Sequence, residues 1–152
     1  MYRTTWLIGK NGWLIMARVD FWLTGQPVGK GRPRFTRQGR AYTPAKTKAY
    51  EMKLAAAASN AMQELKLEPT TKRCKVHILA QFEIPKSWSK KRRDAAIIGE
   101  VFPGRPDIDN IIKAVLDSCN GVTFEDDAQV FRVMATKRYG DPMILVTVEW
   151  DE

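Results

Sequence analysis

The sequence predicts a single-domain α/β sandwich in which a mixed four-stranded sheet is packed by two main helices. Three observations support this fold class. Three segments alternate apolar and polar residues with the period of a β-strand, and a fourth segment, apolar on parts of both faces, is also expected to be a strand. Two longer segments repeat apolar residues with the period of an α-helix. The two kinds of segment are interspersed along one chain of 152 residues, a length that fits one domain.

The domain is assigned to residues 16–152, because the first clean strand pattern begins at Met16. Residues 1–15 are treated as an N-terminal extension. The first strand is expected within residues 17–23, with one apolar side formed by Ala17, Val19, Phe21 and Leu23. A basic stretch rich in glycine and proline follows at residues 25–42, where no regular helix is expected.

A long helix is expected after this basic stretch. Thr43 can cap it, Pro44 suits the first helical position, and the helix should end near Leu67, before Pro69. The next strand is expected to bury the alternate residues Val76, Ile78, Ala80, Phe82 and Ile84. A basic stretch and a short helix follow, and Gly99 ends them.

The second long helix has the most regular apolar spacing in the chain. Its buried face is expected to contain Ile108, Ile111, Ile112, Val115 and Leu116, with Gly121 just past its end. The third strand, within residues 128–139, is apolar on parts of both faces, so a central position is expected. The fourth strand, at residues 143–150, is expected to pair with it through a turn at residues 140–142.

The net charge of +8 and the pI near 9.7 favour a polyanionic partner, with nucleic acid the leading candidate. Cations cluster at residues 30–40 and 86–93. Lys30, Arg32 and Arg34 are the expected DNA contacts, with Lys137 behind them. Trp88 lies within the second cluster, where it could stack on a base or, the favoured interpretation, pack over the edge of the sheet.

Several kinds of site are disfavoured by composition. Cys74 and Cys119 lie far apart, so they are expected to be buried thiols in a reducing cytoplasm and not zinc ligands. The single histidine, His77, argues against Ser-His or Cys-His catalysis. No apolar run approaches the roughly 18 residues of a membrane span, so no membrane association is expected.

Acidic residues collect at two places. Asp107 and Asp109 begin the second long helix, and Glu125, Asp126 and Asp127 lie in the loop before the third strand. If these carboxylates converge, a cation must neutralise them, and hard oxygen ligands suit Mg²⁺, with Mn²⁺ also possible. Together with basic flanks that can hold a phosphate backbone, such a centre would suit metal-dependent phosphodiester hydrolysis.

A purely structural interpretation of the first acids stays open. Asp107 can cap the helix, and Asp109 lies where the helix dipole favours an anion. Asp109 and Lys113 form an i, i+4 pair in the favourable order. Asp117 is expected to position Lys113 from one helical turn further on.

The stretches RPDIDNIIKAVLD and GVTFEDDAQV resemble the signature of the RusA family of Holliday-junction resolvases. The similarity extends to VGKGRPRFTRQGRAYTPAKT and PKSWSKKRR, and so covers nearly everything from about Met16 onward. By motif position, Asp107, Asp109 and Asp127 match the family's essential carboxylates. Lys113 matches its catalytic lysine, and Asp126 matches an acid that can assist.

The resemblance implies a RusA-like fold and a homodimeric, Mg²⁺-dependent endodeoxyribonuclease that resolves four-way DNA junctions symmetrically in DNA recombination and repair. Genes of this kind often lie in phages and prophages, so a mobile-element origin is expected. The glycine-rich segment at residues 30–40 is longer than in the best-known members, which leaves the DNA contacts open. Two alternatives also remain: a nuclease of this fold that prefers flaps or other branched DNA, and a non-catalytic DNA-binding protein.

Overall fold

Four strands form one mixed sheet, as the sequence predicted. The computed structural model describes residues 16–151, so the expected extension at residues 1–15 lies outside the described residues. The strand order is β1-β6-β4-β5. Strand β6 is antiparallel to both of its neighbours, whereas β5 runs parallel to β4. The strands are β1 (Met16–Thr24), β4 (Cys74–Phe82), β5 (Val130–Tyr139) and β6 (Met143–Asp151).

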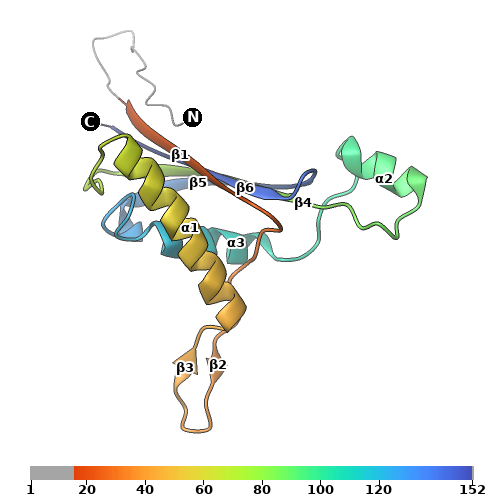
Figure 1. Cartoon of the computed structure of the whole chain (residues 1–152), viewed down its shortest axis with the longest axis horizontal. Helices are drawn as coiled ribbons and strands as arrows, with labels where there is room; N and C mark the ends of the chain where they lie inside the picture. Colours follow the sequence, from red (N-terminus) through yellow and green to blue (C-terminus); the bar gives the residue numbers. More distant parts are fainter. Residues whose placement is uncertain (1–15, 152) are drawn as a thin grey trace.

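Helices α1 (Ala45–Glu64) and α3 (Ile108–Cys119) pack against each other and cover one face of this sheet (Figure 1). The core lies between these two layers. Fully buried strand residues such as Phe21 and Val146 meet Leu54 of α1 and Val115 of α3 there. The predicted fold class, a four-stranded sheet packed by two main helices, is therefore confirmed. The N-cap of α1 is Pro44, one residue later than the expected cap at Thr43.

The expected central position of β5 is wrong. Strand β5 lies at the edge of the sheet, and β4 separates it from β6, so the turn at residues 140–142 does not close a hairpin. The turn instead crosses the end of β4, where Gly140 N donates to the carbonyl of Phe82 at 3.0 Å. The apolar residues on both faces of β5 do not make it a buried strand, because Phe131 and Met134 are 52% and 57% exposed.

Two small elements project from the sheet and its helices (Figure 1). The first is a hairpin formed by β2 (Arg34–Phe35) and β3 (Ala41–Tyr42), which the sequence interpretation missed. The second is α2 (Lys90–Ile97), the short basic helix that was expected before Gly99. Trp88 packs edge-on against Tyr139 at the end of β5, with ring centroids 5.2 Å apart, which confirms the favoured packing interpretation.

Both cysteines are buried, as expected. Burial raises the pKa of the Cys74 thiol to about 11 and that of the Cys119 thiol to about 12. Within residues 16–151, no helix combines the length and apolar character that a membrane crossing requires.

Candidate functional site

The first turn of α3 presents two exposed carboxylates. Asp107 occupies the N-cap position with extended backbone angles (φ −62°, ψ 145°), but its side chain makes no capping hydrogen bond. Asp109 follows in the first helical turn, where the helix dipole favours an anion. Asp107 therefore occupies the expected N-cap position, but its carboxylate accepts no hydrogen bond from the helix amides.

Lys137 stabilises the loop that leads into this turn. Its Nζ atom donates to the carbonyl oxygens of Gly104 at 2.8 Å and Pro106 at 3.0 Å. These carbonyls belong to the loop that leads into α3, so the end of β5 holds the loop in place. Lys137 was expected to contact DNA, but in this structure its ammonium binds the loop before α3.

Lys113 lies one helical turn after Asp109, and its Nζ atom is 3.7 Å from an Asp109 carboxylate oxygen. The two side chains are 62% and 65% exposed, so water screens the pair and its contribution to stability is small. The expected partnership of Lys113 with Asp117 is wrong. Asp117 instead accepts a hydrogen bond from Lys30, which belongs to the basic segment at residues 30–40.

The basic segment is tied to α3 and α1 by its main chain as well. Lys30 N donates to the carbonyl of Asn110 at 2.8 Å, and Gly31 N donates to Thr47 Oγ1 at 3.2 Å. The Lys30 ammonium also lies 3.3 Å from Glu51. Burial acts to lower the pKa of Lys30, but the hydrogen bond that Lys30 donates to Asp117 and the charges of both acids outweigh it, so this pKa is raised above its usual value.

Gly29 makes the close approach of this segment possible. A Cβ atom at this position would lie 2.7 Å from Pro106 Cβ and 3.2 Å from Asn110 Cβ. No side chain larger than hydrogen fits without a shift of the backbone. The sequence therefore needs glycine here for the basic segment to pack on the start of α3.

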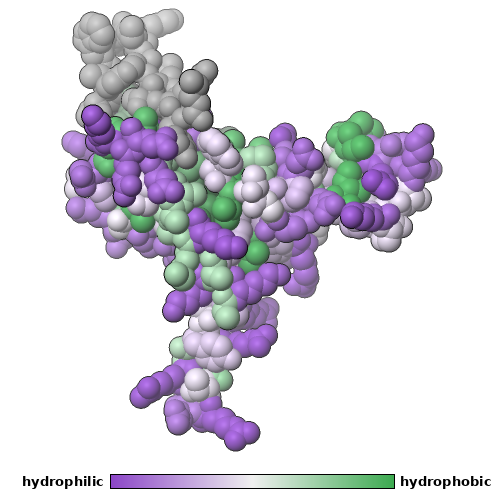
Figure 2. Space-filling view, viewed as in Figure 1, coloured by the Kyte–Doolittle hydropathy of each residue, from purple (hydrophilic) through white to green (hydrophobic). Residues whose placement is uncertain are grey.

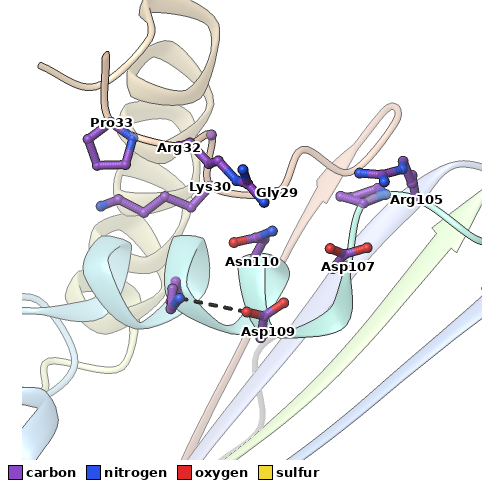
Figure 3. Close-up of a pocket in the computed structure, with 11 residues that line it drawn as sticks. Gly29, Lys30, Arg32, Pro33, Arg105, Asp107, Asp109 and Asn110 are labelled. Atoms are coloured by element: carbon purple, nitrogen blue, oxygen red, sulfur yellow. Dashed lines mark ion pairs between the residues drawn. The ribbon is translucent and has the colours of Figure 1, made fainter. Parts of the chain in front are cut away.

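Together these elements enclose one open cleft of about 880 Å³. Figure 3 shows the Asp107 and Asp109 carboxylates and the Asn110 side chain on the first turn of α3, with the basic segment facing them. The cleft therefore places carboxylate oxygens opposite cations that can bind phosphate. Its charged and amide side chains are those of Lys30, Arg32, Arg105, Asp107, Asp109, Asn110 and Lys113.

The second pair of acids lies elsewhere. Asp126 is the N-cap of a short 3₁₀ helix, η1 (Asp127–Gln129), and its carboxylate accepts a 2.8 Å hydrogen bond from Ala128 N. Gln129 Oε1 returns the bond by accepting from Asp126 N at 2.9 Å, which completes a capping box. Both acids are exposed at the start of β5.

The two acid pairs lie at opposite ends of α3. Lys137, near the end of β5, contacts the loop before α3, whereas Asp127 lies three residues before the start of β5. Helix α3 has 12 residues and is therefore roughly 18 Å long, which is far more than one metal ion can bridge. Among residues 16–151, no three acidic, histidine or cysteine side chains gather in a group that could hold a metal ion.

The cleft thus brings together five of the residues that the sequence interpretation selected: Lys30, Arg32, Asp107, Asp109 and Lys113. It does not contain Asp126 or Asp127. Arg34 lies just outside, on β2. The sequence interpretation missed Arg105 and Asn110 as cleft residues, although both lie close to the two aspartates in the printed sequence.

The fold and the cleft define a class of protein: a basic, single-domain α/β protein whose carboxylates and cations face each other across one cleft. The family model described as Endodeoxyribonuclease RusA matches residues 24–149. The chain belongs to this RusA family of endodeoxyribonucleases. It is also 34% identical over 130 residues to the uncharacterized protein YqaN of Bacillus subtilis (strain 168), an alignment that covers 81% of this chain and 89% of that protein.

Proposed function

We propose that this chain is a divalent-metal-dependent endodeoxyribonuclease that cuts four-way DNA junctions as a homodimer, in DNA recombination and repair. Membership of the RusA family supports an endonuclease. The single observation that carries the proposal is the cleft, in which the exposed Asp107 and Asp109 face Arg32 of the basic segment. This arrangement combines ligands for a hard cation with a donor group for a phosphate oxygen.

The donor set of the cleft fits Mg²⁺, and Mn²⁺ is a second candidate. Magnesium is commonly held by one or two carboxylates together with waters and substrate phosphates. Asp107 and Asp109 supply two carboxylates, and neither is used in a capping hydrogen bond to the helix. The volume of the cleft leaves room for a phosphate. A divalent ion held there would lower the pKa of a water molecule and offset charge on the phosphate.

The chain's own cations would orient the DNA strand. Arg32 lines the cleft and can bind two phosphate oxygens through its guanidinium fork. Lys113 is exposed and weakly paired, so its ammonium can turn from Asp109 toward a phosphate oxygen as charge develops there. Lys30 forms ion pairs with Asp117 and Glu51, so it would instead hold the basic segment against α3.

A homodimer would allow Asp126 and Asp127 to contribute to the same metal site as Asp107 and Asp109. A two-fold axis that crosses α3 near its middle would exchange the two ends of the helix. The partner's Asp126 and the partner's Asp127 would then approach Asp107 and Asp109. Such a dimer would also carry two equivalent centres, as symmetric cutting of two strands requires.

A partly exposed apolar stripe on α3 supports this arrangement. Ile108 is 39% exposed, and Ile112 and Leu116 are partly buried at the i+4 and i+8 positions from it. The stripe therefore runs along the helix between the two acid pairs. Contact between antiparallel copies of α3 would bury it.

The proposal is tested by incubating the protein with labelled four-way, Y-shaped and linear DNA, with and without Mg²⁺. We expect paired, symmetric cuts in the four-way junction that require Mg²⁺. Asp107→Asn and Asp109→Asn should each reduce cutting by at least about 100-fold while junction binding persists. Glu125→Gln, which removes an exposed acid from the other loop, is the matched control and should cut normally.

Each alternative predicts a different result. Preferential cutting of the Y-shaped substrate would favour a flap or branched-DNA nuclease. Binding without any product at saturating Mg²⁺ would favour a non-catalytic DNA-binding protein. Either result would overturn the proposed junction-cutting activity.

A further inference from the structure

The β2–β3 hairpin exposes an aromatic side chain that the proposed chemistry does not use. Phe35 is 71% exposed, the largest value among the large apolar side chains of the described residues. Tyr42, on the other strand, is 47% exposed. Keeping a phenyl ring in water is unfavourable, so an exposed aromatic residue on a projecting element indicates a binding surface.

The hairpin holds these rings in a defined geometry. Phe35 pairs with Ala41 and Arg34 pairs with Tyr42, so the two aromatic residues lie on opposite faces of the two-stranded ribbon. The turn is closed by Thr36 N, which donates to the carbonyl of Arg40 at 2.9 Å, and by Gly39, whose φ of 77° favours glycine. The ring of Phe35 is thus presented on an ordered support.

The charge around the hairpin is of one sign. Figure 2 shows that its projecting end is largely hydrophilic. Between Asp20 and Glu51 the sequence contains no acid, while its cations there are Lys30, Arg32, Arg34, Arg37, Arg40, Lys46 and Lys48. An element with this charge suits a phosphate backbone, and a second copy of this basic chain would be repelled by it.

The hairpin begins at the cleft itself. Arg32 and Pro33 line the cleft, and β2 starts at the next residue. Phe35 lies three residues after Arg32, which is roughly 10 Å of extended chain. That distance is roughly three nucleotide steps along a DNA strand. A phosphate bound by Arg32 would therefore lie within a few nucleotides of the Phe35 ring.

We propose that Phe35 enters the branch point of the DNA junction and stacks on a base there, while the arginines of the hairpin hold the surrounding phosphates. This inference deepens the proposed function and rests on it. Bases at a branch point are more easily unstacked than bases within a duplex, so the ring would favour branched over linear DNA. Phe35 is thus assigned as a specificity-determining residue that acts beside the cleft.

The test uses the full chain and a four-way junction that carries 2-aminopurine at the branch point, with Ca²⁺ in place of Mg²⁺ to prevent cutting. The wild-type protein should raise the fluorescence of 2-aminopurine when it binds. Phe35→Ala should abolish this rise and weaken binding to the junction roughly fivefold to 150-fold, with binding to linear duplex unchanged. Phe35→Trp should restore both the rise and the affinity.

Met52→Ala is the matched control, because it removes an exposed apolar side chain, 65% exposed, from α1 instead of the hairpin. It should behave like the wild type. If the wild-type protein neither binds nor cuts the four-way junction, the proposed function and this inference both fail. If it cuts the junction while Phe35→Ala keeps the fluorescence rise and the affinity, only this inference fails. Loss of the dimer in Phe35→Ala, measured by light scattering, would assign Phe35 to the subunit interface and also overturn it.

Discussion

The main-chain amide of Lys30 donates a 2.8 Å hydrogen bond to the carbonyl of Asn110, and this bond fixes the basic segment against the first turn of α3. The Lys30 side chain strengthens the attachment by pairing with Asp117 and Glu51. The cations of the segment and the aspartates of the helix are therefore held in one geometry before any DNA is bound. Such preorganisation lowers the entropy lost on binding.

Lys30→Met should lower the free energy of unfolding by about 1 kcal/mol at pH 8, because it removes a partly exposed ion pair. The pKa of Lys30 is raised above 10.5, so its contribution is complete below pH 10.5 and is lost as the pH rises through the raised value. Urea unfolding of both proteins at pH 8 and above pH 10.5 measures this difference. Lys48→Met, which changes an exposed lysine, is the control, and a difference that did not shrink at high pH would argue against the ion pair.

Gly29→Ala should force the basic segment away from α3, because the new methyl group would lie 2.7 Å from Pro106 Cβ. We expect a loss of about 1–3 kcal/mol in unfolding free energy and weaker cutting. Gly104→Ala is the matched control, since a Cβ there meets nothing within 4 Å. Equal stability of the two variants would show that the segment can shift without loss.

Asp126→Ala should destabilise the protein by about 1 kcal/mol, because the hydrogen bond to Ala128 N would be lost. Asp126→Asn should unfold like the wild type, since its amide oxygen can still cap η1. Urea unfolding separates the two variants. If Asp126→Asn is stable but cuts less DNA, the loss of activity comes from the missing negative charge and not from unfolding. If Asp126→Ala is as stable as the wild type, the capping role of Asp126 is contradicted.

Most of the core could be predicted from the sequence because its periodicity is regular. The alternation in β4 and β6 and the helical spacing in α3 each place apolar residues on one face, and Val76, Val115 and Val146 are all fully buried. The order of the strands was harder to predict. Strands β5 and β6 are adjacent in sequence, but the turn at Gly140 crosses β4, and neither periodicity nor turn residues indicate such a crossing.

The candidate site was predicted only in part for a related reason. Asp107 and Asp109 are close in sequence and share one helical turn, so local spacing placed them together correctly. Asp127 follows the helix after a short loop, but α3 itself separates the two ends by roughly 18 Å. The contact between Lys30 and Asp117 is a tertiary one across 87 residues of sequence, which local patterns do not reveal.

The central claim is that the acids at the two ends of α3 act together across two protomers. The most direct test is a mixed dimer of Asp109→Asn and Asp127→Asn protomers, purified through two different tags. One of its sites would carry both changes, and the other would carry none. We expect both parent variants to be inactive and the mixed dimer to nick a four-way junction at about half the wild-type rate.

A mixed dimer of Asp107→Asn and Asp109→Asn is the control, because both of its sites would lack a carboxylate and it should stay inactive. A mixed dimer of Asp109→Asn and Asp127→Asn that binds the junction but stays as inactive as its parents would contradict the shared site. Restored nicking in that dimer alone is the result that the shared site predicts.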